Sequence, residues 1–109
     1  MTAATGDVAY TGVGFSPRGA TITSYLGNGS VITGFDDGTL HYSAGLYYNT
    51  AGHWYDTFDF TKSILIYYSN ASGNQVGYIK SWDADGFTIA WTKSGTPTGT
   101  ADIFLSLER

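Results

Sequence analysis

The chain has 109 residues, enough for one domain and too few for two. Aromatic residues make up 17% of it and glycine supplies 15 residues, which is typical of an all-β protein with many tight turns. Only 13% of the residues are charged, so the composition excludes intrinsic disorder for the body of the chain. The net charge is −4 and the five basic residues are scattered, which argues against a nucleic-acid partner.

Cysteine is absent, which excludes disulfides and thiolate metal sites. No apolar run approaches the roughly 20 residues that a membrane span needs, so we expect no membrane partner. The first residues, Met1–Asp7, are small and polar, and they lack the basic and apolar regions of a signal peptide. We expect this segment to be an arm that becomes ordered only when something holds it, followed by one domain over residues 8–109.

Short alternating segments follow one another along the rest of the chain, separated by turn residues at a spacing of roughly 8–12 residues. They predict about nine strands: Val8–Phe15, Gly19–Leu26, Ser30–Phe35, Leu40–Tyr48, Trp54–Phe60, Ser63–Tyr68, Gln75–Trp82, Phe87–Trp91 and Ile103–Leu107. No helix of any size is needed. This rhythm predicts an all-β, jelly-roll-like antiparallel β-sandwich.

The clearest pattern is the segment Ser81–Trp91. Phe87, Ile89 and Trp91 alternate with small polar residues, so one face of this strand is apolar. The preceding Asp-Ala-Asp-Gly sequence favours a tight reversal, because Asp and Gly tolerate positive φ. With the last strand, this hairpin predicts two or three antiparallel strands of one sheet.

The segment Ser63–Tyr68 is apolar on both faces. It predicts either a central strand that is covered twice or a strand that lies in an interface. Several other strands also carry apolar residues on both faces, and a domain of this size has little interior. We therefore expect self-association or docking, the alternative being tyrosines that lie half exposed on a monomer.

Four segments together resemble a family of small bacteriophage virion proteins and virion-protein domains. They are Thr11–Arg18 (TGVGFSPR), Gly34–Gly38 (GFDDG), Ser81–Thr92 (SWDADGFTIAWT) and Ile103–Leu107 (IFLSL). The likeness covers most of the chain from Tyr10 onward. It implies a structural or adhesive role in a phage particle and carries over no catalytic or ligand residue.

For a short chain without heptads or collagen-like triplets, the resemblance implies a capsid decoration (cement) protein. Such a protein would be made in the cytoplasm of the bacterial host and would bind the major capsid protein on the outer surface of the virion. It would associate with itself, as a homotrimer. The arm Met1–Asp7 would then lie along the capsid or a neighbouring subunit.

A surface glycan is the alternative ligand. Aromatic side chains bracket the loop Asn49–Gly52, and their faces could stack on a sugar ring while nearby Asp and Asn side chains form hydrogen bonds. The same residues could instead be core or interface aromatics, which the usual make-up of small sandwiches favours. The candidates for interface or glycan contact are Tyr47, Tyr48, His53, Trp54 and Tyr55.

Metal binding finds little support in the sequence. Asp83 and Asp85 resemble the start of a calcium loop, but a third carboxylate is missing, so a turn stabilised by the Asp side chains is the better interpretation. The two histidines, His41 and His53, have no further ligand at zinc spacing. We predict no metal and no cofactor.

Catalysis finds no motif either. Asp56 and Asp59 could be taken as the carboxylate pair of a glycosidase. Three residues apart on one strand, however, they would point to opposite faces and would not converge on one bond. The sequence therefore predicts a protein that is not an enzyme.

Overall fold

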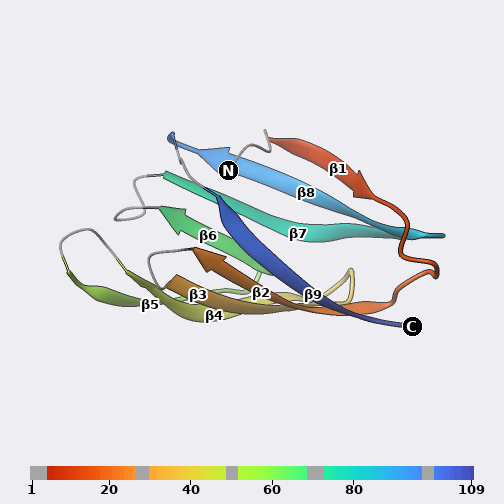
Figure 1. The fold of residues 1–109 in the computed structure, drawn as a ribbon, viewed down its shortest axis with the longest axis horizontal. Coiled ribbons are helices and arrows are strands. Elements are labelled where there is room, and N and C mark those ends of the chain that lie inside the picture. The colour runs from red at the N-terminus through yellow and green to blue at the C-terminus, as the bar shows by residue number, and fades with distance from the viewer. Residues whose placement is uncertain (1–4, 27–29, 49–51, 69–72, 97–99) are drawn as a thin grey trace.

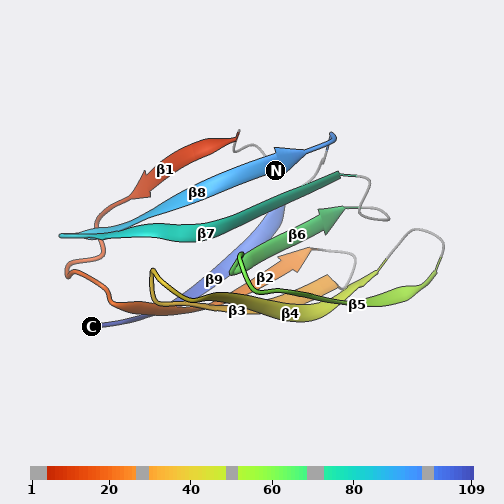
Figure 2. The same cartoon turned by 180° about the vertical axis from the view of Figure 1, so that it is seen from behind.

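The computed structural model describes residues 5–26, 30–48, 52–68, 73–96 and 100–109. These residues form two antiparallel sheets that face each other (Figures 1 and 2), and none of them lies in a helix. The predicted all-β sandwich of nine short strands is therefore confirmed.

The strand order divides the chain unevenly between the two sheets. The four-stranded sheet has the order β1-β8-β7-β6, with β1 at Gly6–Tyr10, β6 at Ile64–Tyr68, β7 at Gly73–Asp83 and β8 at Gly86–Ser94. The five-stranded sheet has the order β5-β4-β3-β2-β9, with β2 at Gly19–Leu26, β3 at Ser30–Asp36, β4 at His41–Tyr48, β5 at Trp54–Asp59 and β9 at Ala101–Glu108.

The core lies between the sheets and follows the period-two pattern of the strands. Ile22 of β2 and Ile64 of β6 are fully buried, and Ile79 of β7 and Ile89 of β8 lie within 2% of full burial. Trp91 of β8 closes the same cluster and donates its indole N–H to the Tyr10 hydroxyl at 3.2 Å. The apolar alternation of Ser81–Trp91 thus marks a core strand, as predicted.

The prediction for the last strand is only partly right. β7 and β8 form the expected hairpin, with Asp83 paired to Gly86, but β9 belongs to the other sheet and pairs with β2 over its whole length. Alternation identifies a strand and its buried face, but it does not identify the neighbour, because both sheets bury their apolar faces in the same core.

The first strand differs from its predicted bounds. It begins at Gly6 and ends at Tyr10, and the following residues leave the sheet, with Gly12 at φ 87° and Gly14 at φ 89°. Gly6 and Asp7, which the sequence placed in the arm, pair with β8. Residues 1–4 of the expected arm lie outside the described residues.

The strand β6 is buried on both faces although it lies at the edge of its sheet. Ile64, Leu65 and Ile66 are 0%, 1% and 5% exposed. The strand reaches this burial because it contacts β2, β3 and β4 of the facing sheet (Figure 2). The predicted coverage of both faces is therefore right, but the predicted central position in the sheet is wrong.

Three of the sequence motifs meet at one end of the sandwich. The carboxylate of Asp85, in the β7–β8 turn, accepts the backbone N–H groups of Gly12 at 3.1 Å and Gly14 at 2.6 Å. The Trp82 indole N–H donates to the carbonyl of Asp37 in the β3–β4 turn at 2.9 Å. These motifs therefore have a structural role, since each turn supports its neighbours.

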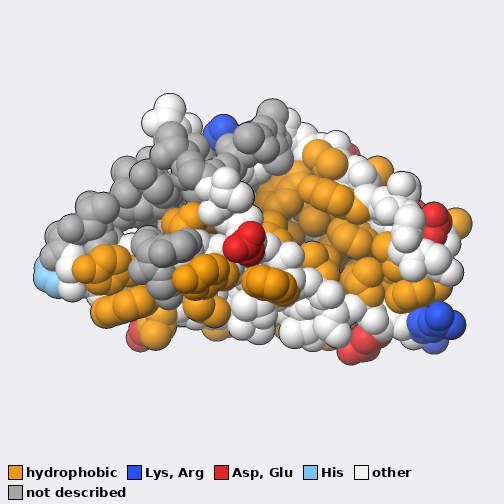
Figure 3. Space-filling model, in the orientation of Figure 1, with side chains coloured by type: hydrophobic (Ala, Val, Ile, Leu, Met, Phe, Trp, Pro, Cys, Tyr) orange, Lys and Arg blue, Asp and Glu red, His pale blue; other side chains and the backbone are white. Residues whose placement is uncertain are grey.

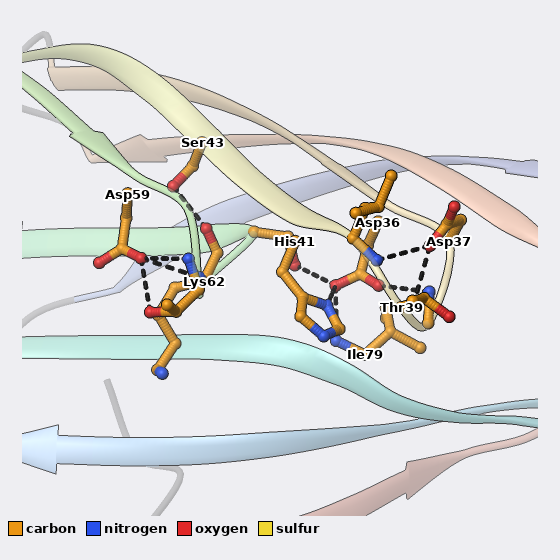
Figure 4. Close-up of polar contacts among 12 residues, drawn as sticks. Asp36, Asp37, Thr39, His41, Ser43, Asp59, Lys62 and Ile79 are labelled. Atoms are coloured by element: carbon orange, nitrogen blue, oxygen red, sulfur yellow. Dashed lines mark hydrogen bonds and ion pairs between the residues drawn. The ribbon is translucent and has the colours of Figure 1, made fainter.

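A buried carboxylate connects the two sheets (Figure 4). Asp36, at the end of β3, is fully buried. Its Oδ2 accepts hydrogen bonds from the Ser63 hydroxyl at 2.6 Å and the Ile79 backbone N–H at 2.8 Å, and it lies 2.9 Å from His41 Nδ1. The pairing of β6 with β7 ends at Gly77, so β6 offers no carbonyl to the N–H of Ile79. The Asp36 carboxylate accepts this hydrogen bond instead of a strand carbonyl.

The chain crosses between the sheets at residues 59–63, just beyond this carboxylate (Figure 4). Asp59 Oδ1 accepts hydrogen bonds from the Thr61 N–H and hydroxyl and from the Lys62 N–H, at 2.6–3.0 Å. The Ser43 hydroxyl donates to the Lys62 carbonyl at 2.7 Å. Partial burial raises the pKa of Asp59, but the hydrogen bonds from Thr61 and Lys62 outweigh it and hold that pKa below 3.8.

This lowered pKa predicts a measurable pH dependence. A carboxylate whose pKa is lower in the folded state adds stability that is fully present above its unfolded value and is lost as the pH falls through the folded value. We expect the free energy of unfolding to fall less between about pH 6 and about pH 2.5 in Asp59→Ala than in wild type. Urea unfolding at both pH values measures this difference. Asp56→Ala is the control, because Asp56 lies on the opposite face of β5 and accepts none of these hydrogen bonds. Equal slopes for wild type and Asp59→Ala would contradict the assignment.

Candidate interaction surface

The outer face of the five-stranded sheet carries most of the exposed large apolar side chains among the described residues. The strand register places one set of side chains on this face, across β2, β3, β4, β5 and β9. We call its large apolar members, together with Phe60, which contacts two of them, the aromatic face: Tyr25, Val31, Phe35, Tyr42, Leu46, Trp54, Phe58, Phe60 and Phe104.

These nine side chains are 36–70% exposed, with Phe58, Phe60 and Phe104 above 60%. A fully buried aromatic side chain removes about 150–250 Å² from water. Nine side chains that are about half exposed therefore present on the order of 900 Å² of apolar surface. Monomeric proteins rarely expose a contiguous apolar patch above about 300–600 Å². The summed apolar surface of this face exceeds that range, with Thr33 and Thr23 lying between its Phe58 and Phe104 ends.

The aromatic face is not flat. One row of residues across the sheet reads Phe58, Ala44, Thr33, Thr23, Phe104 in spatial order, so small side chains lie between two prominent phenylalanines. A shallow groove of about 330 Å³ opens at the Phe58 end of this row. It is lined by Thr21, Thr33, Gly34, Phe35, Tyr42, Ser43, Ala44, Phe58 and Phe60.

The opposite side of the molecule is different. On the outer face of the four-stranded sheet, the register brings together small and polar side chains of β1 and β8: Asp7, Ala9, Thr88, Ala90 and Thr92. The contrast shows that the aromatic face is not a general property of this sequence. Val76 and Tyr78 of β7 also lie on this second face but are half-buried, so among the described residues the large apolar side chains that are exposed on an outer face belong to the five-stranded sheet.

The charges of the aromatic face have one sign. Among the described outward-facing residues of the five strands, Asp56, Asp102 and Glu108 are acidic and none is basic. A surface that docks here is therefore expected to be apolar with basic residues at its rim.

The structure divides the five aromatic residues singled out in the sequence between two sides of the β4–β5 hairpin. The ring of Tyr47 stacks on that of Tyr55, with 5.3 Å between ring centroids. It packs edge-on against the ring of Tyr67 from β6, with 5.0 Å between centroids. His53 contacts Tyr55 at 6.4 Å. On the aromatic face, Tyr48 lies 5.0 Å from Trp54, which is 54% exposed. These residues therefore do not form one concave site, because neighbouring positions on a strand point to opposite faces.

The three most exposed residues of the aromatic face were not predicted as site residues from the sequence. Phe58, Phe60 and Phe104 lie in or next to predicted strands, but none of them was predicted to form a site. The sequence does contain a sign of this face, because large apolar residues also occupy the outward positions of several alternating strands. This sign could not be used without the sheet order, because only the order shows that these positions are adjacent.

Asp83, Asp85 and Asp59, three of the carboxylates considered as metal ligands or catalytic groups, accept hydrogen bonds from neighbouring groups. Asp83 accepts hydrogen bonds from the hydroxyls of Ser81 at 2.9 Å and Thr88 at 2.8 Å. Asp56 and Asp59 lie on opposite faces of β5, as the alternation predicted. Within the described ranges, no group of three or more His, Asp or Glu side chains is placed to hold a metal ion.

The described residues also contain no helix long and apolar enough to cross a membrane. Comparison of the chain with family models, with curated proteins and with solved structures finds no match in any of the three.

Proposed function

We propose that this protein is a structural protein of a bacteriophage virion, a capsid decoration protein that docks on the major capsid protein through its aromatic face and stabilises the shell. The observation that carries a docking function is the set of nine large apolar side chains, 36–70% exposed, on one outer face. The phage context comes from the sequence resemblance and from nothing else.

The size of the aromatic face agrees with this role. A stable protein–protein interface buries about 800 Å² on each partner, so this face can support a specific contact by itself. Its aromatic residues are of the kind that dominate binding energy when they fill pockets on a partner. A shell protein that gains such contacts resists internal pressure better, because each decoration adds buried area between neighbouring subunits.

Binding to capsids that lack the protein tests this proposal. We expect the double variant Phe58→Ser/Phe60→Ser to bind such capsids at least about tenfold more weakly than wild type, because two of the most exposed aromatic anchors are lost. Both side chains are more than two-thirds exposed, so the fold should persist. Cosedimentation across a concentration series measures the affinity.

The matched control is Thr92→Ala, on the outer face of the four-stranded sheet, which should bind like wild type. Two outcomes would contradict the proposal. One is a wild-type protein that fails to bind any phage shell, and the other is a double variant that binds as tightly as wild type.

A carbohydrate-binding adhesin is the second candidate, and the observation that favours it is Trp54. Its ring is more than half exposed, and Asp56 follows it on the same face, which is the pairing of a stacking surface with a hydrogen-bond acceptor. On a glycan array, binding that disappears in Trp54→Ala would support this candidate. An array without signal for wild type would reject it.

A further inference from the structure

The edge strand β9 lacks most of the devices that usually protect a sheet edge. It is the last strand of the five-stranded sheet, and it pairs with β2 in unbroken register over all eight residues, Ala101–Glu108. It contains no proline, no lysine and no bulge, and its charged residues are Asp102 and Glu108. Natural sheets normally blunt an edge of this length with one of these devices, because its free backbone groups can pair with another strand.

The inward-facing side of β9 is also incompletely covered. Ile103, Leu105 and Leu107 pack against the core but are only half-buried, whereas the residues paired with them in the neighbouring strand β2 are buried. In the facing sheet, Val8 and Tyr10 of the edge strand β1 are each 37% exposed. Figure 3 looks onto this side and shows hydrophobic side chains gathered between β8 and β9. An added strand beside β9 would cover this apolar surface.

The sequence of β9 is complementary to itself. In an antiparallel pair centred on Phe104, Ile103 would face Leu105 of a second copy, Asp102 would face Ser106, and Ala101 would face Leu107. Apolar residues then meet apolar residues on the inner face, two phenylalanines meet on the outer face, and no like charges are opposed. A register centred on Leu105 would instead place Asp102 against Glu108, which is unfavourable.

We propose that β9 pairs with β9 of a second copy of this chain, antiparallel and about a two-fold axis at Phe104, which gives a dimer in place of the homotrimer that the sequence resemblance implies. The two five-stranded sheets then join into one sheet of ten strands. Their aromatic faces become one continuous surface of twice the area, which leaves that surface free for a partner. This pairing does not depend on the proposed docking to a capsid, because it uses a sheet edge and not the sheet face.

The test compares one substitution at the two ends of the same row of residues. Phe104→Lys places two lysines opposite each other at the centre of the proposed pair, whereas Phe58→Lys makes the same change on β5, at the other edge of the sheet. The two side chains are 61% and 68% exposed, so both variants should fold, which circular dichroism checks.

Light scattering on a size-exclusion column should give the mass of two chains for wild type and for Phe58→Lys. It should give one chain for Phe104→Lys at the same concentration, with dimerisation weakened by at least about tenfold. A wild-type mass of one or three chains overturns the proposal. So does a change that is equal in both variants, because it would place the contact on the aromatic face.

Cysteine cross-linking tests the register, since the chain has no cysteine of its own. Directly opposed residues of an antiparallel pair have Cα atoms about 4.5–5.5 Å apart, which is within the range of a disulfide. Phe104→Cys should therefore form a disulfide-linked dimer upon mild oxidation, and Phe58→Cys should not. Equal cross-linking of both variants, or of neither, overturns pairing at Phe104.

These assays use the purified chain without any capsid. Loss of the dimer with intact capsid binding would therefore reject the strand pairing alone. Loss of capsid binding by an intact dimer would reject the proposed function alone.

Discussion

Replacement of Asp36 by alanine is expected to lower the free energy of unfolding by about 3–5 kcal/mol. The side chain is fully buried, and its Oδ1 also accepts the Gly38 N–H, at 2.8 Å. Alanine would leave the hydroxyl of Ser63, the N–H of Ile79 and the ring of His41 without this acceptor. Each buried donor that loses its partner costs about 1–3 kcal/mol, so the total is a large fraction of the stability of a small domain.

Urea unfolding followed by tryptophan fluorescence measures this loss. Asp37→Ala is the matched control, because Asp37 lies in the same turn and its Oδ1 accepts only the turn N–H groups of Thr39 and Leu40. We expect it to lose about 1 kcal/mol, as for a lost cap. Equal losses in the two variants would show that the buried carboxylate does not hold the sheets together.

Replacement of Gly34 by alanine is expected to cost about 3 kcal/mol or more. Gly34 lies on the inner face of β3, where the crossing segment packs directly on the sheet. A Cβ atom there would lie 1.8 Å from the carbonyl oxygen of Ser63 and 2.9 Å from that of Tyr42. Both neighbours are backbone atoms, so neither can rotate away, and the crossing segment must move.

Gly19→Ala provides the control in the neighbouring strand β2. Its Cβ would meet nothing closer than the Glu108 carboxylate at 3.4 Å, the flexible end of a side chain. We expect a change between zero and about 1 kcal/mol of added stability, because alanine restricts the unfolded chain more than glycine does. Thermal unfolding of both variants tests the pair, and a Gly34→Ala protein as stable as wild type would refute the close approach.

Asp36 and Gly34 both lie against Ser63, so the two substitutions disturb the same part of the crossing segment. This segment connects the stability of the fold to the proposed function. The Ser63 hydroxyl donates to Asp36, its N–H donates to Gly77 of β7 at 3.1 Å, and its carbonyl faces Gly34. Changes at these residues should shift the two sheets relative to each other. The aromatic face would remain on the surface, but its support would be less rigid, and binding that depends on shape would weaken.

The sequence by itself determined the strands and the faces they bury. Alternation is a local property, since successive side chains of a strand point to opposite sides whatever the strand pairs with. Phe87, Ile89 and Trp91 were therefore assigned correctly to a buried face before any partner was known. The turn at residues 83–86 was equally clear, because Asp and Gly favour tight reversals wherever the chain lies.

Only the tertiary structure decided which strands are neighbours. The pattern of Ile103–Leu107 fits either sheet, because both sheets face one core, and the pairing of β9 with β2 follows from how the chain crosses between them. For the same reason, the aromatic face could not be assembled in advance. Tyr25, Phe58 and Phe104 are far apart in the sequence and share a face only through the register of five strands.

The candidate site shows the same division. Aromatic residues around the loop at 49–52 suggested a single cluster, but Tyr47 and Tyr48 point to opposite sides of the sheet, as adjacent residues of a strand must. The sequence around Asp36, Asp-Asp-Gly, is typical of a turn, and the burial of this carboxylate depends on the point at which β6 stops pairing and leaves the N–H of Ile79 to it. Local sequence encodes the direction of each side chain, whereas the fold decides what each side chain meets, because contacts join residues that are distant along the chain.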